Sequence, residues 1–259
     1  MKRIRQIIAF LILVCCAMAI YGAYHYYAPP QIKESYQMKE ADDTLRIAYI
    51  GDSWAYMHKD YDHLLATMIE RDLHRPVQVY SYGICGLTSK EIYEHLYDDN
   101  EYKHFFLERS YSYCYISAGI NDTYKKMSTR YYKKSMDGII QLLLANNIRP
   151  IIQEIPDYDI PKTFYRQSRS RKVLRYFSMF INNTSKDCKA DYRNALNELI
   201  NEKGYQDKVS IVRYKSWNND YQNDLVQLYV GDGMHLNTKG YEKLDSVIAQ
   251  EIITQHTKQ

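Results

Sequence analysis

The stretch LRIAYIGDSW, residues 45–54, indicates the fold class of this chain. Leu45–Ile50 is a short apolar run that stops at Gly51, a pattern that predicts a buried strand of a parallel sheet. Ser53 lies three residues beyond Ile50, where a turn from strand to helix would expose its hydroxyl. In parallel α/β sheets, functional sites form beyond the carboxyl ends of the strands. The stretch therefore predicts an α/β fold and a candidate nucleophile together.

Strand and helix patterns alternate through the rest of the chain. Four further apolar runs predict strands at Val77–Tyr82, Tyr113–Ser117, Pro150–Ile155 and Val209–Tyr214. Helices are expected around Leu64–Ile69 and at Ser89–Leu96 (capped by Ser89), Tyr132–Asn146, Arg169–Ile181, Asp191–Glu202 and Gly240–Thr254. Strands separated by helices predict one five-stranded parallel sheet with helices on both faces. No repeat and no second domain is visible.

The first thirty residues are a separate segment. Basic residues come first, then an apolar run from Ile7 to Ala23, and then tyrosines and Pro29-Pro30. This order is typical of a secretory signal or an N-terminal membrane anchor. Ala17-Met18-Ala19 would suit cleavage, and the residue before Cys15 or Cys16 is too bulky for a typical lipoprotein signal. The run with its tyrosines approaches the roughly 20 residues that span a bilayer, which favours an uncleaved anchor. We therefore expect an anchor or signal over 1–30, a polar linker over 31–44, and one exported domain over 45–259.

Charge and cysteine content exclude several classes of protein. The net charge of +3 comes from the three basic residues of the first segment, so the remaining chain is neutral and gives no support for nucleic-acid binding. No C-x-x-C or H-x-x-x-H spacing appears, and we expect neither a metal nor a cofactor. Cys85, Cys114 and Cys188 lie outside the apolar run. They allow one disulfide at most, with Cys85 and Cys114 as candidate neighbours, or three buried thiols.

Three later segments supply partners for Ser53. They are Gly86, the segment Gly119-Ile120-Asn121-Asp122, and the segment Asp232-Gly233-Met234-His235. A serine hydroxyl needs a base, and histidine, with an ordinary pKa of about 6.5, is the natural one. Asp232 lies three residues before His235 and could hold one ring nitrogen, leaving the other to face Ser53. An acyl-transfer site also needs oxyanion donors. The Ser53 and Gly86 N–H groups and the Asn121 amide are the candidates.

Neighbouring residues have alternative interpretations. Ser53 alone could be a helix N-cap. Gly83 is an alternative to Gly86 as the glycine that donates to the oxyanion. Asp52 is interpreted as structural, holding the serine loop. Trp54 is the aromatic side chain that we expect to contact substrate; the alternative is that it packs against the first helix.

These four blocks resemble those of the SGNH/GDSL hydrolases: a G-D-S, a glycine, a G-x-N-D and a D-x-x-H in that order. The resemblance covers residues 45–255 and implies a flavodoxin-like three-layer α/β/α sandwich. It implies Ser53 as nucleophile, His235 as base and Asp232 as its orienting group, with Gly86 and Asn121 in the oxyanion hole. Trp54 stands where leucine is usual, and Ile84-Cys85 precedes Gly86 where small polar residues are commoner.

The sequence thus predicts an exported serine esterase that removes acetyl or similar small acyl groups from a carbohydrate or cell-envelope polymer. The 28 tyrosines, against 6 phenylalanines, suit sugar binding, although ordinary packing explains them equally well. Alternatives are an O-acyltransferase with the same residues, a lipase or lysophospholipase, and an inactive glycan-binding module. A basic run could line the cleft or form a solvated helix face, with Asp157 and Asp159 pairing with it. It comprises Arg166, Arg169, Arg171, Lys172 and Arg175.

Overall fold

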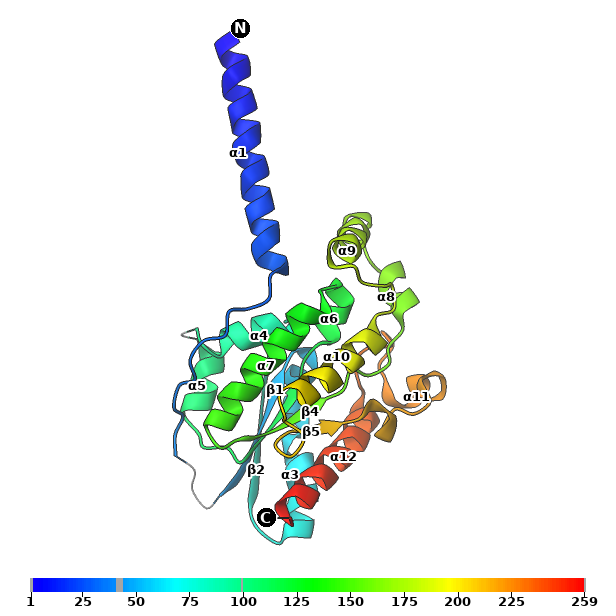
Figure 1. The fold of residues 1–259 in the computed structure, drawn as a ribbon. Coiled ribbons are helices and arrows are strands. Elements are labelled where there is room, and N and C mark those ends of the chain that lie inside the picture. The colour runs from blue at the N-terminus through cyan, green and yellow to red at the C-terminus, as the bar shows by residue number, and fades with distance from the viewer. Residues whose placement is uncertain (1, 41–43, 99, 259) are drawn as a thin grey trace.

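Figure 1 shows the computed structural model, which describes residues 2–40, 44–98 and 100–258. The last part of the expected linker, residues 41–43, therefore lies outside the described residues. One parallel sheet contains β1 (Leu45–Gly51), β2 (Val77–Gly83), β3 (Tyr113–Ser117), β4 (Arg149–Gln153) and β5 (Ser210–Val212). The strand order is β2-β1-β3-β4-β5, so all carboxyl ends meet at one edge. The predicted five-stranded parallel sheet is confirmed.

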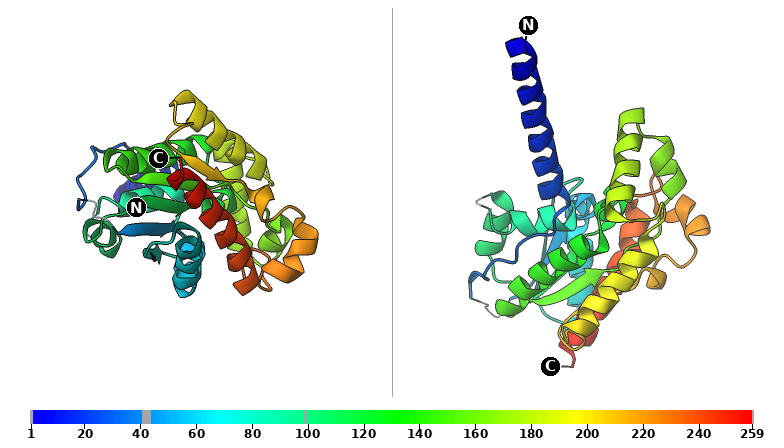
Figure 2. Two further views of the ribbon diagram at one scale, coloured as in Figure 1. Left: turned by 90° about the horizontal axis from the view of Figure 1, so that it is seen from below. Right: turned by 45° about the horizontal axis from the view of Figure 1, so that its top comes forward.

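Helices cover both faces of the sheet, as Figures 1 and 2 show. One face carries α4 (Ser89–His95), α5 (Glu101–Leu107), α7 (Thr129–Ala145) and α10 (Lys189–Glu202). The other carries α2 (Ser53–His58), α3 (Asp62–Leu73) and α12 (Thr238–His256), with the short 3₁₀ turn Lys59–Tyr61 between the first two. Alternate residues of β1 serve the two cores, because side chains in a strand point to opposite faces. Ala48 and Ile50 pack on the first face, whereas Ile47 and Tyr49 pack on the second.

Apart from the N-terminal helix, the remaining helices belong to loops at the carboxyl edge of the sheet. They are α6 (Ile120–Lys125) after β3, α8 (Ile160–Tyr165) and α9 (Arg169–Asn182) after β4, and α11 (Tyr221–Leu228) after β5 and the 3₁₀ turn Tyr214–Ser216. The helices α8 and α9 form one excursion between β4 and α10, which we call the α8–α9 hairpin. These loops surround the edge at which the candidate site lies.

Two local expectations were wrong. The strand expected at Val209–Tyr214 is only three residues long, because the Glu154 carboxylate accepts the Tyr214 N–H at 3.1 Å and turns the chain away from the sheet. The cap of α4 is Thr88 rather than Ser89: Thr88 forms a capping box with Glu91. Ser89 instead donates its hydroxyl to Asp122.

The N-terminal helix α1 (Lys2–Tyr27) projects away from the domain (Figure 1). Its segment Arg5–Tyr27 is 23 residues long and apolar enough to cross a membrane. At about 1.5 Å per residue such a segment reaches roughly 35 Å, against a hydrocarbon core of about 30 Å. The helix is therefore compatible with either a membrane anchor or a signal segment.

The chain that follows α1 is fastened along the domain over residues 30–38. Ile32, Tyr36 and Met38 pack against the core on the α4 and α7 face. The Met38 N–H donates to the Asn146 side chain at 2.8 Å, and the Asn146 amide donates to the Tyr36 carbonyl at 2.8 Å. Part of the segment expected to be a linker is thus a strap held against α7.

Candidate active site

The turn from β1 into α2 sets the position of Ser53. A Cβ atom on Gly51 would lie 2.1 Å from the Ser117 carbonyl oxygen, so only glycine permits this close approach of β1 and β3. Asp52 caps α2, because its Oδ1 accepts the Trp54 N–H at 3.0 Å. Ser53 is therefore the first helical residue and not the N-cap. Its hydroxyl points instead to a histidine from the far end of the chain.

Ser53, His235 and Asp232 form one continuous chain of hydrogen bonds. Ser53 Oγ lies 2.9 Å from His235 Nε2, and His235 Nδ1 lies 2.5 Å from Asp232 Oδ2. The second oxygen of Asp232 accepts the Met234 and His235 N–H groups at 2.8 and 3.0 Å. The sequence block Asp232–His235 is thus folded back on its own aspartate, and the imidazole is fixed between the carboxylate and the serine.

Local interactions also decide the charge of Asp232. Burial alone would raise the pKa of this carboxyl, but the His235 ring and the two backbone N–H groups more than compensate. The pKa therefore lies below its usual value, and Asp232 stays ionised near neutral pH. An ionised carboxylate at Nδ1 favours the tautomer that presents a bare Nε2 to the serine hydroxyl.

Gly86 and Asn121 lie beside the serine and line the same cavity. Gly86 has a φ of +84°, and a Cβ atom there would meet no protein atom within 4 Å. The positive φ thus requires glycine, and any side chain would project into open space where a substrate could bind. The competing Gly83 is packed against α2: a Cβ there would lie 2.3 Å from the Asp52 carbonyl oxygen.

A second pair of contacts ties the Gly86 loop to α6. The buried Asp122 carboxylate accepts the Ser89 N–H at 2.8 Å and also accepts the Ser89 hydroxyl. Burial raises the pKa of Asp122 to about 6, although these Ser89 bonds act in the opposite direction. Asp122 therefore connects the helix that carries Asn121 to the helix that follows Gly86.

The cavity at these residues has a volume of about 350 Å³. Besides the residues already described, its lining includes Met57, Cys85, Tyr124, Thr163, Arg166 and Met234. Sequence reasoning assigned no site role to Met57, Tyr124, Thr163 or Met234. A signal was present for three of them: Met57 lies four residues after Ser53 on α2, Tyr124 lies three residues after Asn121 on α6, and Met234 directly precedes His235.

The expectation that Trp54 contacts substrate was wrong. Its side chain is fully buried and packs edge-on against Trp217, with ring centroids 5.8 Å apart. Its carbonyl accepts the Tyr241 hydroxyl at 3.0 Å. Because successive helical residues are rotated by about 100°, the residue after Ser53 faces the core and not the cavity.

The basic run is divided between several environments. Arg166 lines the cavity beside Ser53 and donates to the Gly231 carbonyl at 2.9 Å. Arg175 is buried, whereas Arg169 and Arg171 are exposed. The expected acidic partners are engaged elsewhere: Asp157 pairs with Arg193, and Asp159 caps α8.

Within the described residues, the cysteines form no disulfide and the potential metal ligands form no metal-binding group. All five cysteines lie within the described residues and are free thiols, with Cys114 and Cys188 buried and Cys85 exposed beside the cavity. Within residues 2–40, 44–98 and 100–258, no group of three or more histidine, cysteine or acidic side chains is placed to hold a metal ion.

Residues 49–243, about three quarters of the chain, match the GDSL-like lipase/acylhydrolase family. The chain belongs to this family. The resemblance to the SGNH/GDSL hydrolases is thereby confirmed, and membership supports ester-hydrolase activity in general.

Solved structures share the fold at low sequence identity. A lipase/acylhydrolase from Enterococcus faecalis has a TM-score of 0.57 and 17% identity, with 82% of this chain and 96% of that chain covered. An acetyl xylan esterase, AlAXEase, has a TM-score of 0.52 and 15% identity, with 81% and 98% covered. At such identities the likeness shows the fold alone.

A curated relative matches over part of its length. It is the N-acylneuraminate cytidylyltransferase of Escherichia coli O18:K1:H7, strain RS218, 25% identical over 182 residues. The match includes 67% of this chain but only 35% of that protein. The chain therefore spans about a third of the length of this relative.

Proposed function

We propose that this chain is an exported serine esterase of the SGNH type. It removes acetyl or similar small acyl groups from a carbohydrate or cell-envelope polymer. The observation that carries the proposal is the hydrogen-bond chain from Ser53 through His235 to Asp232, which borders a cavity together with Gly86 and Asn121. We further propose that α1 stays attached as a membrane anchor and that residues 45–259 form the catalytic domain.

Acylation begins at the serine. Ser53 Oγ attacks the ester carbonyl carbon while its proton passes to His235 Nε2, 2.9 Å away. Asp232 stabilises the resulting imidazolium and keeps the ring in place. His235 then gives the proton to the alkoxide oxygen of the leaving sugar, the carbon–oxygen ester bond breaks, and the acyl group remains on Ser53.

Negative charge develops on the former carbonyl oxygen during this step. The Ser53 and Gly86 N–H groups and the Asn121 side-chain amide are the donors that we assign to it. One hydrogen of the Asn121 amide is already donated to Asp52 at 2.8 Å, so the amide is oriented before substrate arrives and its second hydrogen remains for the oxyanion. Donors fixed in advance avoid reorganisation during the reaction.

Deacylation repeats the sequence with water. His235 accepts a proton from the water that attacks the acyl carbonyl carbon and then returns it to Ser53 Oγ. The bond between the acyl carbon and Oγ breaks, the acyl group leaves as the free acid, and the serine hydroxyl is restored. A catalytic cavity of about 350 Å³ suits a small acyl group. The fold likeness to an acetyl xylan esterase is compatible with a sugar ester as substrate.

Turnover of p-nitrophenyl esters of increasing chain length tests the proposal. The whole chain in detergent micelles should hydrolyse the acetate fastest, and Ser53→Ala should abolish turnover. Ser246→Ala, on the exposed side of α12, is the matched control and should retain full activity. Absence of serine-dependent hydrolysis of any ester by folded protein would refute an esterase. A preference for long chains would instead indicate a lipase.

One observation favours an O-acyltransferase as the second candidate. A larger cavity, of about 770 Å³, adjoins the catalytic one and shares Gly86, Asn121 and Tyr124 with it. Such space could hold an acceptor hydroxyl in place of water. Product analysis with an acyl donor and a glycan together would separate the two reactions. Transfer exceeding hydrolysis would identify a transferase, and saturable glycan binding without turnover, unaffected by Ser53→Ala, would identify a binding module.

A further inference from the structure

Helix α9 carries an apolar stripe on its solvent side. The stripe follows the spacing i, i+1, i+4, i+7, i+8, which gathers side chains on one helical face. Its members, with their exposed fractions, are Val173 (66%), Leu174 (61%), Phe177 (48%), Phe180 (82%) and Ile181 (49%). A contiguous exposed face of this kind indicates an interaction surface, whereas single exposed apolar residues are ordinary.

The opposite, polar face of α9 is fixed against the domain. The Arg175 guanidinium is buried and lies 3.5 Å from the Phe164 ring centroid and 4.5 Å from that of Tyr124. Its Nη1 also donates to the Gln167 side chain at 3.3 Å. Rotating the stripe toward the domain would break this stacking and expose the arginine, so the apolar face cannot be turned onto the domain.

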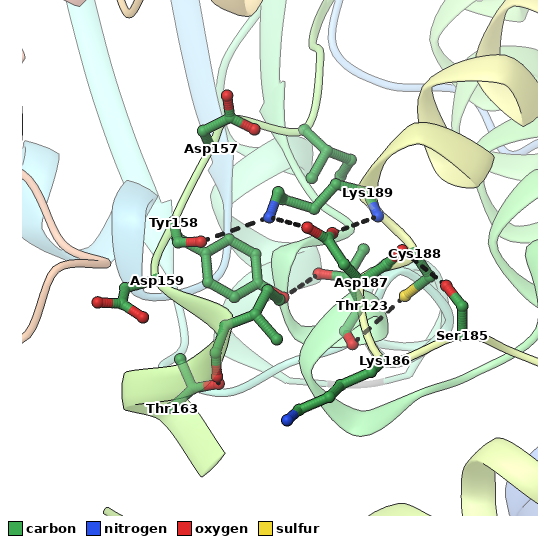
Figure 3. Close-up of polar contacts among 12 residues, drawn as sticks. Thr123, Asp157, Tyr158, Asp159, Thr163, Ser185, Lys186, Asp187, Cys188 and Lys189 are labelled. Carbon is green, nitrogen blue, oxygen red and sulfur yellow. Dashed lines mark hydrogen bonds and ion pairs between the residues drawn. The ribbon is translucent and has the colours of Figure 1, made fainter. Parts of the chain in front are cut away.

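The base of the α8–α9 hairpin is also clamped, as Figure 3 shows. The Tyr158 hydroxyl lies 2.8 Å from the Thr123 hydroxyl on α6. At the other end of the hairpin, Lys189, the first residue of α10, donates to the Tyr158 carbonyl at 3.4 Å and to the Asp187 carboxylate at 2.9 Å. Both ends of the excursion are therefore joined to each other and to α6, and the direction of α9 is set by the domain.

The apolar stripe lies beside the end of α1. The Tyr27 hydroxyl is 2.5 Å from the Ser178 hydroxyl of α9. The cavity of about 770 Å³ has Gly22, Ala23, Tyr26 and Tyr27 of α1 on one side and Leu174 and Phe177 of α9 on the other. Figures 1 and 2 show both helices extending from the carboxyl edge of the sheet. If α1 spans a bilayer, Tyr24, Tyr26 and Tyr27 mark its interface, because tyrosine prefers that depth.

We propose that the apolar stripe of α9 lies in the lipid interface of the membrane that α1 spans, as a second membrane contact. Amphipathic helices lie in this layer with their apolar face buried about 5–10 Å. The exposed Arg169 and Arg171, in the first turn of α9, suit anionic lipid headgroups. Because the catalytic cavity shares residues with the cavity between α1 and α9, this contact would present Ser53 at the membrane surface. The inference rests on the proposed retention of α1, not on the proposed reaction.

Fluorescence quenching by brominated lipids tests this contact in the whole chain. The native tryptophans, Trp54 and Trp217, are fully buried and give a constant background. Phe180→Trp places a reporter on the stripe. Lys208→Trp places a matched reporter on an exposed residue just before β5, at the opposite edge of the sheet. Leu13→Trp reports on α1 itself. Each variant would be reconstituted in lipid nanodiscs with and without brominated acyl chains.

We expect strong quenching of the reporters at 13 and 180 and background quenching at 208. Quenching at 13 without quenching at 180 would overturn the inference while leaving α1 as an anchor. If the reporter at 180 is unquenched and nanodiscs hold paired chains, the stripe instead contacts a second copy. No quenching at 13 would also overturn it, because α1 would then lie outside the bilayer. Serine-dependent esterase activity, measured in parallel, tests the proposed function separately.

Discussion

Asn121 donates its side-chain amide to Asp52 at 2.8 Å, linking the third block of the site to the turn that carries the nucleophile. Asp52 is fully buried, and its other oxygen accepts the Trp54 N–H. Burial raises the pKa of this carboxyl to about 7 despite these bonds. Asp52 does not line the catalytic cavity, so we consider it a positioning residue that acts through Asn121.

Substitution of the pair should reveal this dependence. Asn121→Ala removes an oxyanion donor and should lower kcat about 10²–10³-fold with little change in KM. Asp52→Asn leaves the donor but loosens its orientation, so its loss should be smaller and again in kcat. The double variant should resemble Asn121→Ala alone, because the positioning effect disappears with its target. Steady-state kinetics of the four proteins measures this; fully additive losses would contradict the positioning role.

Asp232→Asn tests the orientation of the base. The amide would favour the wrong imidazole tautomer, and kcat should fall about 10⁴-fold while the fold remains intact. Asp207→Asn, at an exposed position before β5, is the matched control and should have no effect. Ester hydrolysis and labelling of Ser53 by a fluorophosphonate should both decline in Asp232→Asn. Unchanged labelling would mean that Asp232 does not activate the serine through His235.

Much of the hydrogen-bond chain from Ser53 to Asp232 could be predicted from the sequence, because Asp232 and His235 are neighbours in the chain. Only two residues separate Asp232 from His235, and Ser53 follows a strand whose apolar pattern is plain. The approach of His235 to Ser53, across 182 residues, was predicted from chemistry, because a serine nucleophile needs a base. The resemblance to the SGNH/GDSL hydrolases then implied the role of each of these residues.

Residues outside these blocks depended on tertiary contacts that no local pattern contains. Trp54 looked like a site residue by position, but the helix that begins at Ser53 turns it toward Trp217. Ser89 was predicted to cap a helix, but its hydroxyl donates to Asp122, 33 residues away. The stripe on α9 is amphipathic in sequence, yet the sequence did not show that Arg175 forms the inward face. In each case the deciding partner is distant in the chain.

A buried cluster supports the helix that carries Ser53. His58, at the end of α2, lies 2.9 Å from Asp245 on α12 through Nε2 and 2.7 Å from the Ser81 hydroxyl through Nδ1. Asp62 also lies 3.1 Å from Nδ1. Burial alone would lower the pKa of His58, but the two carboxylates outweigh it and raise the pKa to about 9. The cluster thus joins α2, α3, β2 and α12 beneath the active site.

The His58 cluster should make stability depend on pH. The folded-state pKa exceeds the unfolded value of about 6.5, so the stabilisation is fully present below pH 6.5 and is lost as pH rises toward 9. His58→Gln leaves the buried Asp245 carboxylate without its charged partner and should cost about 3 kcal/mol at pH 6, or roughly 6–12 °C in the unfolding midpoint. Thermal unfolding in detergent at pH 6 and 9.5 measures this. A difference between wild type and variant that does not shrink at the higher pH would contradict the assigned charge.

Gly86→Ala and Gly204→Ala together separate backbone strain from catalysis. Both glycines have positive φ, +84° and +64°, and a Cβ atom on either would meet no protein atom within 4 Å. Each substitution should therefore cost a similar 1–2 kcal/mol of stability, because the left-handed region is unfavourable for alanine. Only Gly86 lines the catalytic cavity. Gly86→Ala should therefore lower kcat/KM at least tenfold, since its methyl group enters the space beside Ser53, whereas Gly204→Ala should keep full activity. Equal activities in the two variants would remove Gly86 from the oxyanion site.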